Sequence, residues 1–125
     1  MPVVRYLLDS DVIIEYLKDN RETVTLINKT GGKGLSCSVL TIIEVKRGVR
    51  PKQEATSADL FKIIKAYPVD KQIAELAVAF AREWQGKGKF LQLVDACIAA
   101  TCVIYDLTLV TYNKRDYPMK ELRII

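Results

Sequence analysis

The chain has 125 residues, half of them hydrophobic, and a formal net charge of +4 at pH 7. This length suits one domain with a single sizeable core, residues 1–125, and the hydrophobic content argues against a disordered protein. The sequence contains no histidine, which excludes Ser-His-Asp and Cys-His catalysis and histidine-ligated zinc.

Neither the apolar runs nor the cysteines point to a membrane or secreted protein. No apolar run reaches the roughly 18 residues of a membrane span, and the N-terminus lacks the pattern of a signal peptide. Cys37, Cys97 and Cys102 lie among apolar neighbours and form no CxxC pair. We therefore expect reduced core thiols in a cytoplasmic protein that has no membrane partner.

Short apolar runs alternate with segments of helical spacing along the first half of the chain. This pattern predicts strands separated by helices. Ser10 or Asp11 can cap the first helix, and Gly31-Gly32 can end the second. The elements predicted for this half are a strand at 3–8, helices at 10–18 and 22–29, a strand at 35–38, and a helix at 39–47 that ends at Gly48.

The same alternation continues after Pro51, which interrupts the chain. The elements predicted here are helices at 57–66, 71–84 and 96–105, short strands at 68–69, 107–110 and 122–125, and loops at 86–89 and 112–118. Strands that alternate with helices favour an α/β fold. We expect a three-layer α/β/α sandwich with a mostly parallel central sheet.

Four acidic residues lie beside apolar runs at the expected ends of these elements: Asp9, Glu44, Asp95 and Asp116. Asp9 follows the first strand directly, and Asp116 lies in the loop after the 107–110 strand. Glu44 and Asp95 are expected in the first turns of helices that begin near the same edge. Because sites in parallel sheets gather beyond the carboxyl ends of the strands, we expect the four acids to converge.

Each acid taken alone also has a structural explanation. These explanations are a helix cap at 9–11, a capping box at Thr41-x-x-Glu44, a cap of the 96–105 helix by Asp95, and a turn at 113–116. The group is harder to explain, because two carboxylates about 4 Å apart repel by roughly 4 kcal/mol at an effective dielectric of about 20. Converging acids therefore need protons or a cation, and Mg²⁺ or Mn²⁺ suits an all-oxygen site.

Four segments of the chain resemble the motif blocks of PIN-domain nucleases: LLDSDVIIEYL, SVLTIIEVKRG, LVDACIAATC and TLVTYNKRDY. Their order and spacing, and the length of the chain, are closest to the VapC-type toxins of type II toxin–antitoxin pairs. The resemblance covers nearly the whole chain. It implies a PIN-like fold, endoribonuclease activity on RNA, a cognate antitoxin protein as partner, and a homodimer.

The resemblance also implies roles for individual residues. Asp9 and Asp95 would bind Mg²⁺ or Mn²⁺, and Glu44 and Asp116 would complete the acidic site, with Asp116 at the family's least regular position. The polar residues that match positions accompanying these acids in the family are Thr41, Thr111 and Asn113. Tyr117 stands where phenylalanine is commoner, which we expect to be harmless, and we expect Asp11 to cap a helix.

A site of this kind would cut RNA by hydrolysis. One or two metal ions would hold the scissile phosphate and activate a water that attacks in line, leaving a 5′-phosphate and a 3′-hydroxyl. Basic residues close to the acidic motifs are candidates for binding RNA phosphates, and a solvated basic surface is the equal alternative. These residues are Lys46, Arg47, Arg50, Lys52, Lys87, Lys89, Lys114 and Arg115.

Two other functions stay open at the level of sequence. A phospho-acceptor receiver domain shares this length, an α/β fold and an acidic pocket, and Asp70 is the only candidate for its acceptor between residues 35 and 70. A non-catalytic PIN-like module would bind RNA or a protein without cleaving either.

Overall fold

A parallel five-stranded sheet organises the protein, a computed structural model of which describes residues 4–29 and 34–125. The strand order is β3-β2-β1-β4-β5, and each neighbouring pair is parallel. The strands are β1 (Tyr6–Leu8), β2 (Leu35–Ser38), β3 (Lys65–Tyr67), β4 (Thr108–Val110) and β5 (Arg123–Ile124). The predicted α/β class and the parallel sheet are confirmed.

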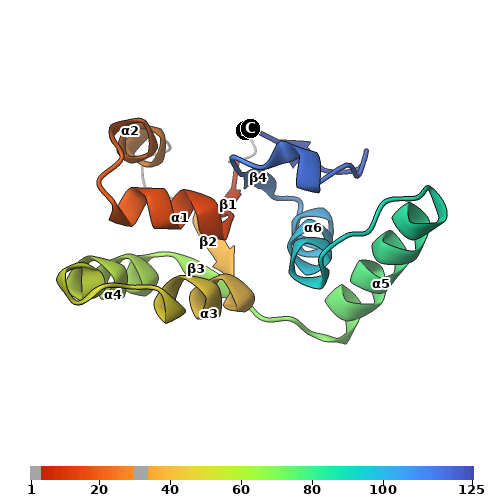
Figure 1. Ribbon diagram of the computed structural model, residues 1–125, viewed down its shortest axis with the longest axis horizontal. Coiled ribbons are helices and arrows are strands. Elements are labelled where there is room, and N and C mark those ends of the chain that lie inside the picture. The colour runs from red at the N-terminus through yellow and green to blue at the C-terminus, as the bar shows by residue number, and fades with distance from the viewer. Residues whose placement is uncertain (1–3, 30–33) are drawn as a thin grey trace.

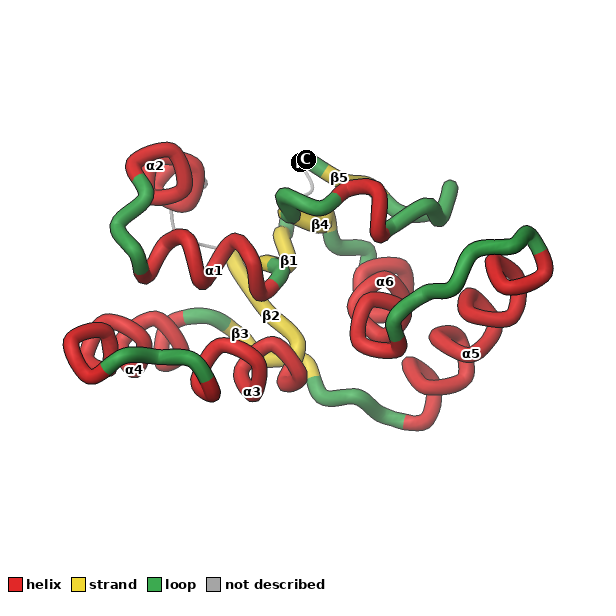
Figure 2. Tube along the Cα trace, in the orientation of Figure 1, coloured by secondary structure: helices red, strands yellow, loops and turns green. Residues whose placement is uncertain are grey.

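Helices cover both faces of this sheet. Figure 1 shows α1 to α4 on one side of the strands and α5 and α6 on the other, and Figure 2 shows the strands in yellow between these two layers. The helices are α1 (Ser10–Leu17), α2 (Arg21–Lys29), α3 (Val39–Arg47), α4 (Glu54–Ile63), α5 (Lys71–Gly86) and α6 (Leu93–Tyr105), with short 3₁₀ segments η1 (Pro51–Gln53) and η2 (Lys114–Asp116). The three-layer sandwich is therefore confirmed.

Successive residues of the central strands face opposite layers, as the pleat of a strand requires. Leu7 and Leu109 pack in the core cluster that contains α5 and α6. Leu8 and Val110 pack in the cluster formed with α1 to α4. Since both faces of β1 and β4 are covered, most of their residues are apolar, and this explains why the sequence predicts both strands.

The sheet order changes direction at β1, and this change positions the candidate site. The chain passes from β1 to β2 and β3 on one side, then returns to place β4 on the other side of β1. Crevices open at such switch points beyond the carboxyl ends of the strands. Asp9 follows β1 and its amide donates to the Val110 carbonyl at 3.0 Å, so the ends of β1 and β4 meet there.

The chain between Pro51 and Val69 differs from the prediction. The helix expected at 57–66 is α4, which runs from Glu54 to Ile63, because η1 leads directly into it. Ser57, expected at the helix start, is buried inside it. The strand expected at 68–69 is β3, Lys65–Tyr67, which pairs with β2; Pro68 follows it and favours an extended conformation for Tyr67.

Gly48 ends α3 as predicted, but most of the predicted N-caps are wrong. Asp9, not Ser10 or Asp11, is the N-cap of α1. Ser38 caps α3 through its hydroxyl, which leaves Glu44 as the sixth residue of that helix, outside the first turn and outside any capping box. The N-cap of α6 is Gln92, so Asp95 lies in the first turn, as expected, but is not the cap. Residue 3 and Gly31-Gly32 lie outside the described residues.

The cysteines match the expectation of core thiols. Cys37 and Cys102 are buried, Cys97 is partly buried, and all three are free. Burial raises the pKa of the Cys37 and Cys102 thiols to about 12, which keeps them protonated at neutral pH.

In the described parts of the chain, no helix has both the length and the hydropathy needed to cross a membrane.

Replacing Ile98 by alanine should lower the free energy of unfolding by about 2–5 kcal/mol, because this fully buried residue of α6 would leave a cavity. Urea denaturation would measure the change. Ile43→Ala is the matched control, since Ile43 is a helical isoleucine that is 63% exposed, and it should cost less than about 1 kcal/mol. Equal losses in the two variants would contradict this assignment of the core.

Candidate active site

Asp9, at the switch point of the sheet, is the most deeply buried of the four predicted acids. It is only 8% exposed. Its Oδ1 accepts a hydrogen bond from the Ser10 amide at 2.8 Å. Its Oδ2 accepts one from Thr111 Oγ1 at 2.9 Å and one from the Tyr117 hydroxyl at 2.9 Å. Donors from α1, from the residue after β4 and from the residue after η2 thus fix its orientation.

Asp95 is joined to Asp9 through the same tyrosine. The Tyr117 hydroxyl lies 3.2 Å from Asp95 Oδ1. Burial, followed by the negative charge of Asp9, raises the pKa of Asp95 to about 6; the charges of Asp116 and Glu44 add to the increase, and the hydrogen bond from Tyr117 opposes it. The other three predicted acids therefore lie near enough to Asp95 for their charges to act on it.

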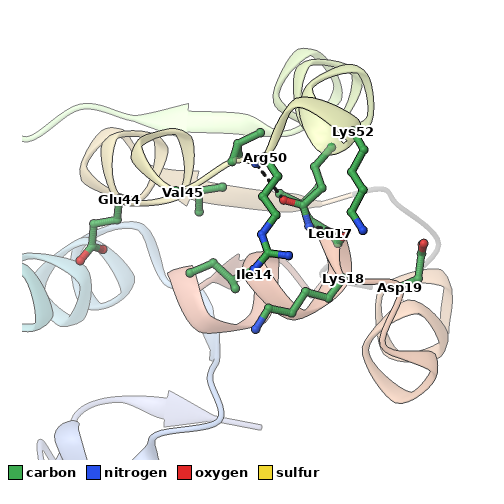
Figure 3. Close-up of a pocket in the computed structure, with 11 residues that line it drawn as sticks. Ile14, Leu17, Lys18, Asp19, Glu44, Val45, Arg50 and Lys52 are labelled. Carbon is green, nitrogen blue, oxygen red and sulfur yellow. Dashed lines mark hydrogen bonds between the residues drawn. The ribbon is translucent and has the colours of Figure 1, made fainter.

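Glu44 reaches this region from the middle of α3. Its Oε1 accepts a hydrogen bond from Ser10 Oγ at 2.5 Å, which ties α3 to the start of α1. Figure 3 shows Glu44 at one end of a groove, with its carboxylate turned away from Arg50 and Lys52. Ser10 was predicted only as a possible cap, and its role as the partner of Glu44 depends on a contact across 34 positions of the chain.

The predicted polar residues divide into two groups. Thr111 and Asn113 belong to the hydrogen-bond network around Asp9. The backbone amide of Asn113 donates to Thr111 Oγ1 at 3.0 Å, and Thr111 Oγ1 donates to Asp9. Thr41 is fully buried in α3, and within residues 4–29 and 34–125 its hydroxyl finds no hydrogen-bond partner. Thr41 was expected to support the acidic site, but its hydroxyl bonds none of the acids.

Asp11 holds the loop after β4 instead of capping α1. Its Oδ2 accepts hydrogen bonds from the Tyr112 amide at 3.0 Å and from Asn113 Nδ2 at 2.9 Å. Burial, followed by the charge of Asp9, raises the pKa of Asp11 to about 6. Asp11 is thus a fifth acid near the switch point, and it positions the segment that carries Asn113.

Tyr117 contacts the acidic site in a way that the sequence analysis did not predict. It is 3% exposed, and its hydroxyl contacts both Asp9 and Asp95. Burial, followed by the charges of these two acids, raises the pKa of Tyr117, so the hydroxyl stays a proton donor. The sequence did contain one signal for this role. Tyr117 directly follows Asp116 and carries a hydroxyl that phenylalanine, the commoner residue at this position, lacks.

The basic candidates surround the acids unevenly. A groove of about 410 Å³ between α1 and α3 ends at Glu44; its lining includes Ile14, Leu17, Val45, Val49, Lys18, Arg50 and Lys52. Lys46 lies over the Phe61 ring, 5.7 Å from its centroid. Arg47, Lys114 and Arg115 are exposed, and Lys89 Nζ donates to the Arg115 carbonyl. Lys114 and Arg115 directly precede Asp116 in η2, whereas Arg50 shares with Glu44 only the lining of the groove.

The donor set suits a hard divalent cation. Every acid side chain at the switch point offers oxygen, the ligand that Mg²⁺ and Mn²⁺ prefer, and buried like charges need a counter-charge. Among the described residues, no three acidic or cysteine side chains are grouped closely enough to hold one ion together. Asp9 and Asp95, linked by one hydroxyl, are the pair best placed to share an ion.

Two observations contradict the phospho-acceptor interpretation. Asp70, its only acceptor candidate, is the N-cap of α5, where its Oδ1 accepts a hydrogen bond from the Ile73 amide at 2.9 Å. The strand order 3-2-1-4-5 also differs from the 2-1-3-4-5 order of receiver-type folds.

Comparison with known proteins agrees with this geometry. Residues 6–123 match the family model of the PIN domain. Ribonuclease VapC10 of Mycobacterium tuberculosis is 30% identical over 118 residues, 92% of this chain and 87% of the relative. Two solved structures share the fold: DNA-bound VapBC from Salmonella typhimurium (TM-score 0.85, 20% identity, 98% of this chain and 97% of that chain) and a toxin–antitoxin complex from Klebsiella pneumoniae (0.79, 24%, 96% and 95%). The chain therefore belongs to the PIN domain family.

Proposed function

We propose that the protein is a metal-dependent endoribonuclease that hydrolyses RNA phosphodiester bonds and acts as the toxin of a toxin–antitoxin pair. The observation that carries this proposal is the contact of one Tyr117 hydroxyl with both Asp9 and Asp95 at the switch point of the sheet. Glu44 is tied to the start of α1 beside them through Ser10, and the charges of Glu44 and Asp116 contribute to the raised pKa of Asp95. The name of the similar VapC10, a ribonuclease, supports RNA as the substrate.

Asp9 and Asp95 would hold Mg²⁺ or Mn²⁺, and Glu44 and Asp116 would complete the site directly or through water. A bound cation of this kind supplies a water of lowered pKa and positive charge for the scissile phosphate. Thr111 orients Asp9 by its hydrogen bond. Ser10 does the same for Glu44.

Basic side chains would hold the flanking phosphates of the RNA. Arg50 lines the groove that ends at Glu44, and Lys114 and Arg115 precede Asp116 in η2. Positive charge beside the acidic site would offset the repulsion between RNA and the carboxylates.

A protein antitoxin and a second copy of the chain are the partners that we propose. The structures similar in fold are a toxin–antitoxin complex and a VapBC complex, which supports the antitoxin; the homodimer rests on the family resemblance. The antitoxin can be tested directly. The product of a short reading frame beside the gene should co-purify with the protein and block RNA cleavage.

Asp95→Asn should reduce Mg²⁺- or Mn²⁺-dependent RNA cleavage to the rate seen without metal, because it removes one of the two principal ligands. Sequencing of RNA ends should show 5′-phosphates and 3′-hydroxyls for the wild type alone, and the circular dichroism spectra should agree. Asp106→Asn, at the exposed end of the same helix, is the control and should keep full activity. Wild-type cleavage by the Asp95 variant would refute the proposal, and Mn²⁺ binding without any cleavage would favour a non-catalytic module.

In metal-free buffer at pH 7.5, Asp95→Asn should melt at a higher temperature than the wild type. The pKa of Asp95 is raised to about 6 in the folded protein, against about 3.9 when unfolded. The stabilisation of the folded protein by the protonated Asp95 carboxyl is therefore complete below about pH 4. It is lost as the pH rises through about 6. The difference between the two melting temperatures should shrink toward pH 4, whereas a constant difference would contradict the charge repulsion.

Lys114→Glu and Arg47→Glu should weaken RNA binding and flatten its salt dependence. Each lost phosphate contact reduces the steepness of the fall of log affinity with log salt by about 1. The measurement belongs in the Asp95→Asn background, so that the RNA stays intact. Lys71→Glu is the control, since Lys71 is an exposed cation on α5; an equal loss from Lys71→Glu would indicate non-specific attraction.

A further inference from the structure

The Tyr117 hydroxyl contacts both principal carboxylates, those of Asp9 and Asp95. Tyr117 follows η2, Asp9 follows β1, and Asp95 lies in the first turn of α6. The hydroxyl oxygen is 2.9 Å from Asp9 Oδ2 and 3.2 Å from Asp95 Oδ1. A single side chain thus sets how two elements, 86 positions apart in the chain, present their acids to each other.

The bridge uses one oxygen of each carboxylate. A carboxylate offers about four lone-pair positions, and on Asp9 Oδ2 the two positions are taken by Thr111 and Tyr117. Within residues 4–29 and 34–125, Oδ1 of Asp9 accepts one hydrogen bond, from the Ser10 backbone amide. For Asp95, Oδ2 lies outside the bridge. Each acid therefore has one oxygen committed to Tyr117 and one left for another ligand.

We infer that Tyr117 is a positioning residue that restricts Asp9 and Asp95 to one ligating oxygen each and so makes the site selective for small divalent cations. This inference rests on the proposed function, since it assumes that these acids bind the ion. Mg²⁺ demands a compact octahedral shell and takes carboxylates through one oxygen. Ca²⁺ is larger and accepts both oxygens of one carboxylate.

The hydroxyl adds nothing to packing that a phenylalanine ring would not supply. The Tyr117 ring belongs to the core cluster around α5 and α6, and a phenylalanine would fill the same space. The hydroxyl is a buried polar group, and its single proton is shared between Asp9 Oδ2 and Asp95 Oδ1. Its removal therefore tests the positioning role without opening a cavity.

The experiment is calorimetric titration of the wild type and Tyr117→Phe with Mn²⁺ and, separately, with Ca²⁺. Partners that orient metal ligands typically contribute about 10–100-fold to metal affinity. Tyr117→Phe should therefore lose about 10-fold or more in Mn²⁺ affinity. It should lose less for Ca²⁺, because both oxygens of each acid become free, so the ratio of the two affinities should fall. Mn²⁺ should also raise the melting temperature of the variant less than that of the wild type.

Tyr67→Phe is the matched control, because Tyr67 is an equally buried tyrosine on β3 and should leave both affinities unchanged. An unchanged ratio of Mn²⁺ to Ca²⁺ affinity in Tyr117→Phe, with normal Mn²⁺ binding by the wild type, would overturn this inference alone. Failure of the wild type to bind Mn²⁺ would overturn it together with the metal dependence of the proposed function.

Discussion

The position of Asp9 at the end of the central strand is the constraint on which the candidate site depends. Leu7 and Leu8 are buried on opposite faces of the sheet, so the residue that follows them has little freedom to move. After burial, the charge of Asp9 is the next cause of the raised pKa of Asp11, Asp95 and Tyr117. One immobile carboxylate therefore sets the electrostatics of its neighbours.

The protein tolerates this charge because its hydrogen-bond donors come from distant parts of the chain. Thr111 and Tyr117 bond Asp9 across more than 100 positions, and Ser10 bonds Glu44 across 34. These contacts exist only when β1, β4 and the surrounding helices are in place. The acidic site is consequently a product of the complete fold, and it concentrates unfavourable charge that a bound cation would offset.

The acids could be predicted from the sequence because they interrupt strong patterns. Asp9 ends an apolar run that is buried on both faces, and Asp95 begins a run of small apolar residues in the first turn of α6. Topology then brings strand ends together without further information. The same reasoning gave the layers and the parallel sheet, since each depends on local periodicity and on the alternation of elements.

The remaining errors arise where local and tertiary signals compete. Thr41 and Glu44 have the spacing of a capping box, yet Ser38 stands earlier and ends a paired strand, so it takes the cap. Ser57 resembles a helix start but lies buried within α4. The partners of Ser10 and Tyr117 are set by distances between elements, which residue spacing does not contain.

The acidic crevice and the basic surface pose a single electrostatic problem for an RNA ligand. Lys114 and Arg115 are exposed directly before Asp116, so attraction and repulsion of phosphate lie within a few residues of each other. Long-range attraction depends on the net charge of the surface, whereas close approach depends on the carboxylates themselves. Under the proposed function, a divalent cation would resolve the conflict, because it would relieve the repulsion among the acids and offer positive charge to the phosphate. In the proposed function, ion binding and RNA binding are therefore coupled through the charge of Asp9 and its neighbours, and neither can be understood without the other.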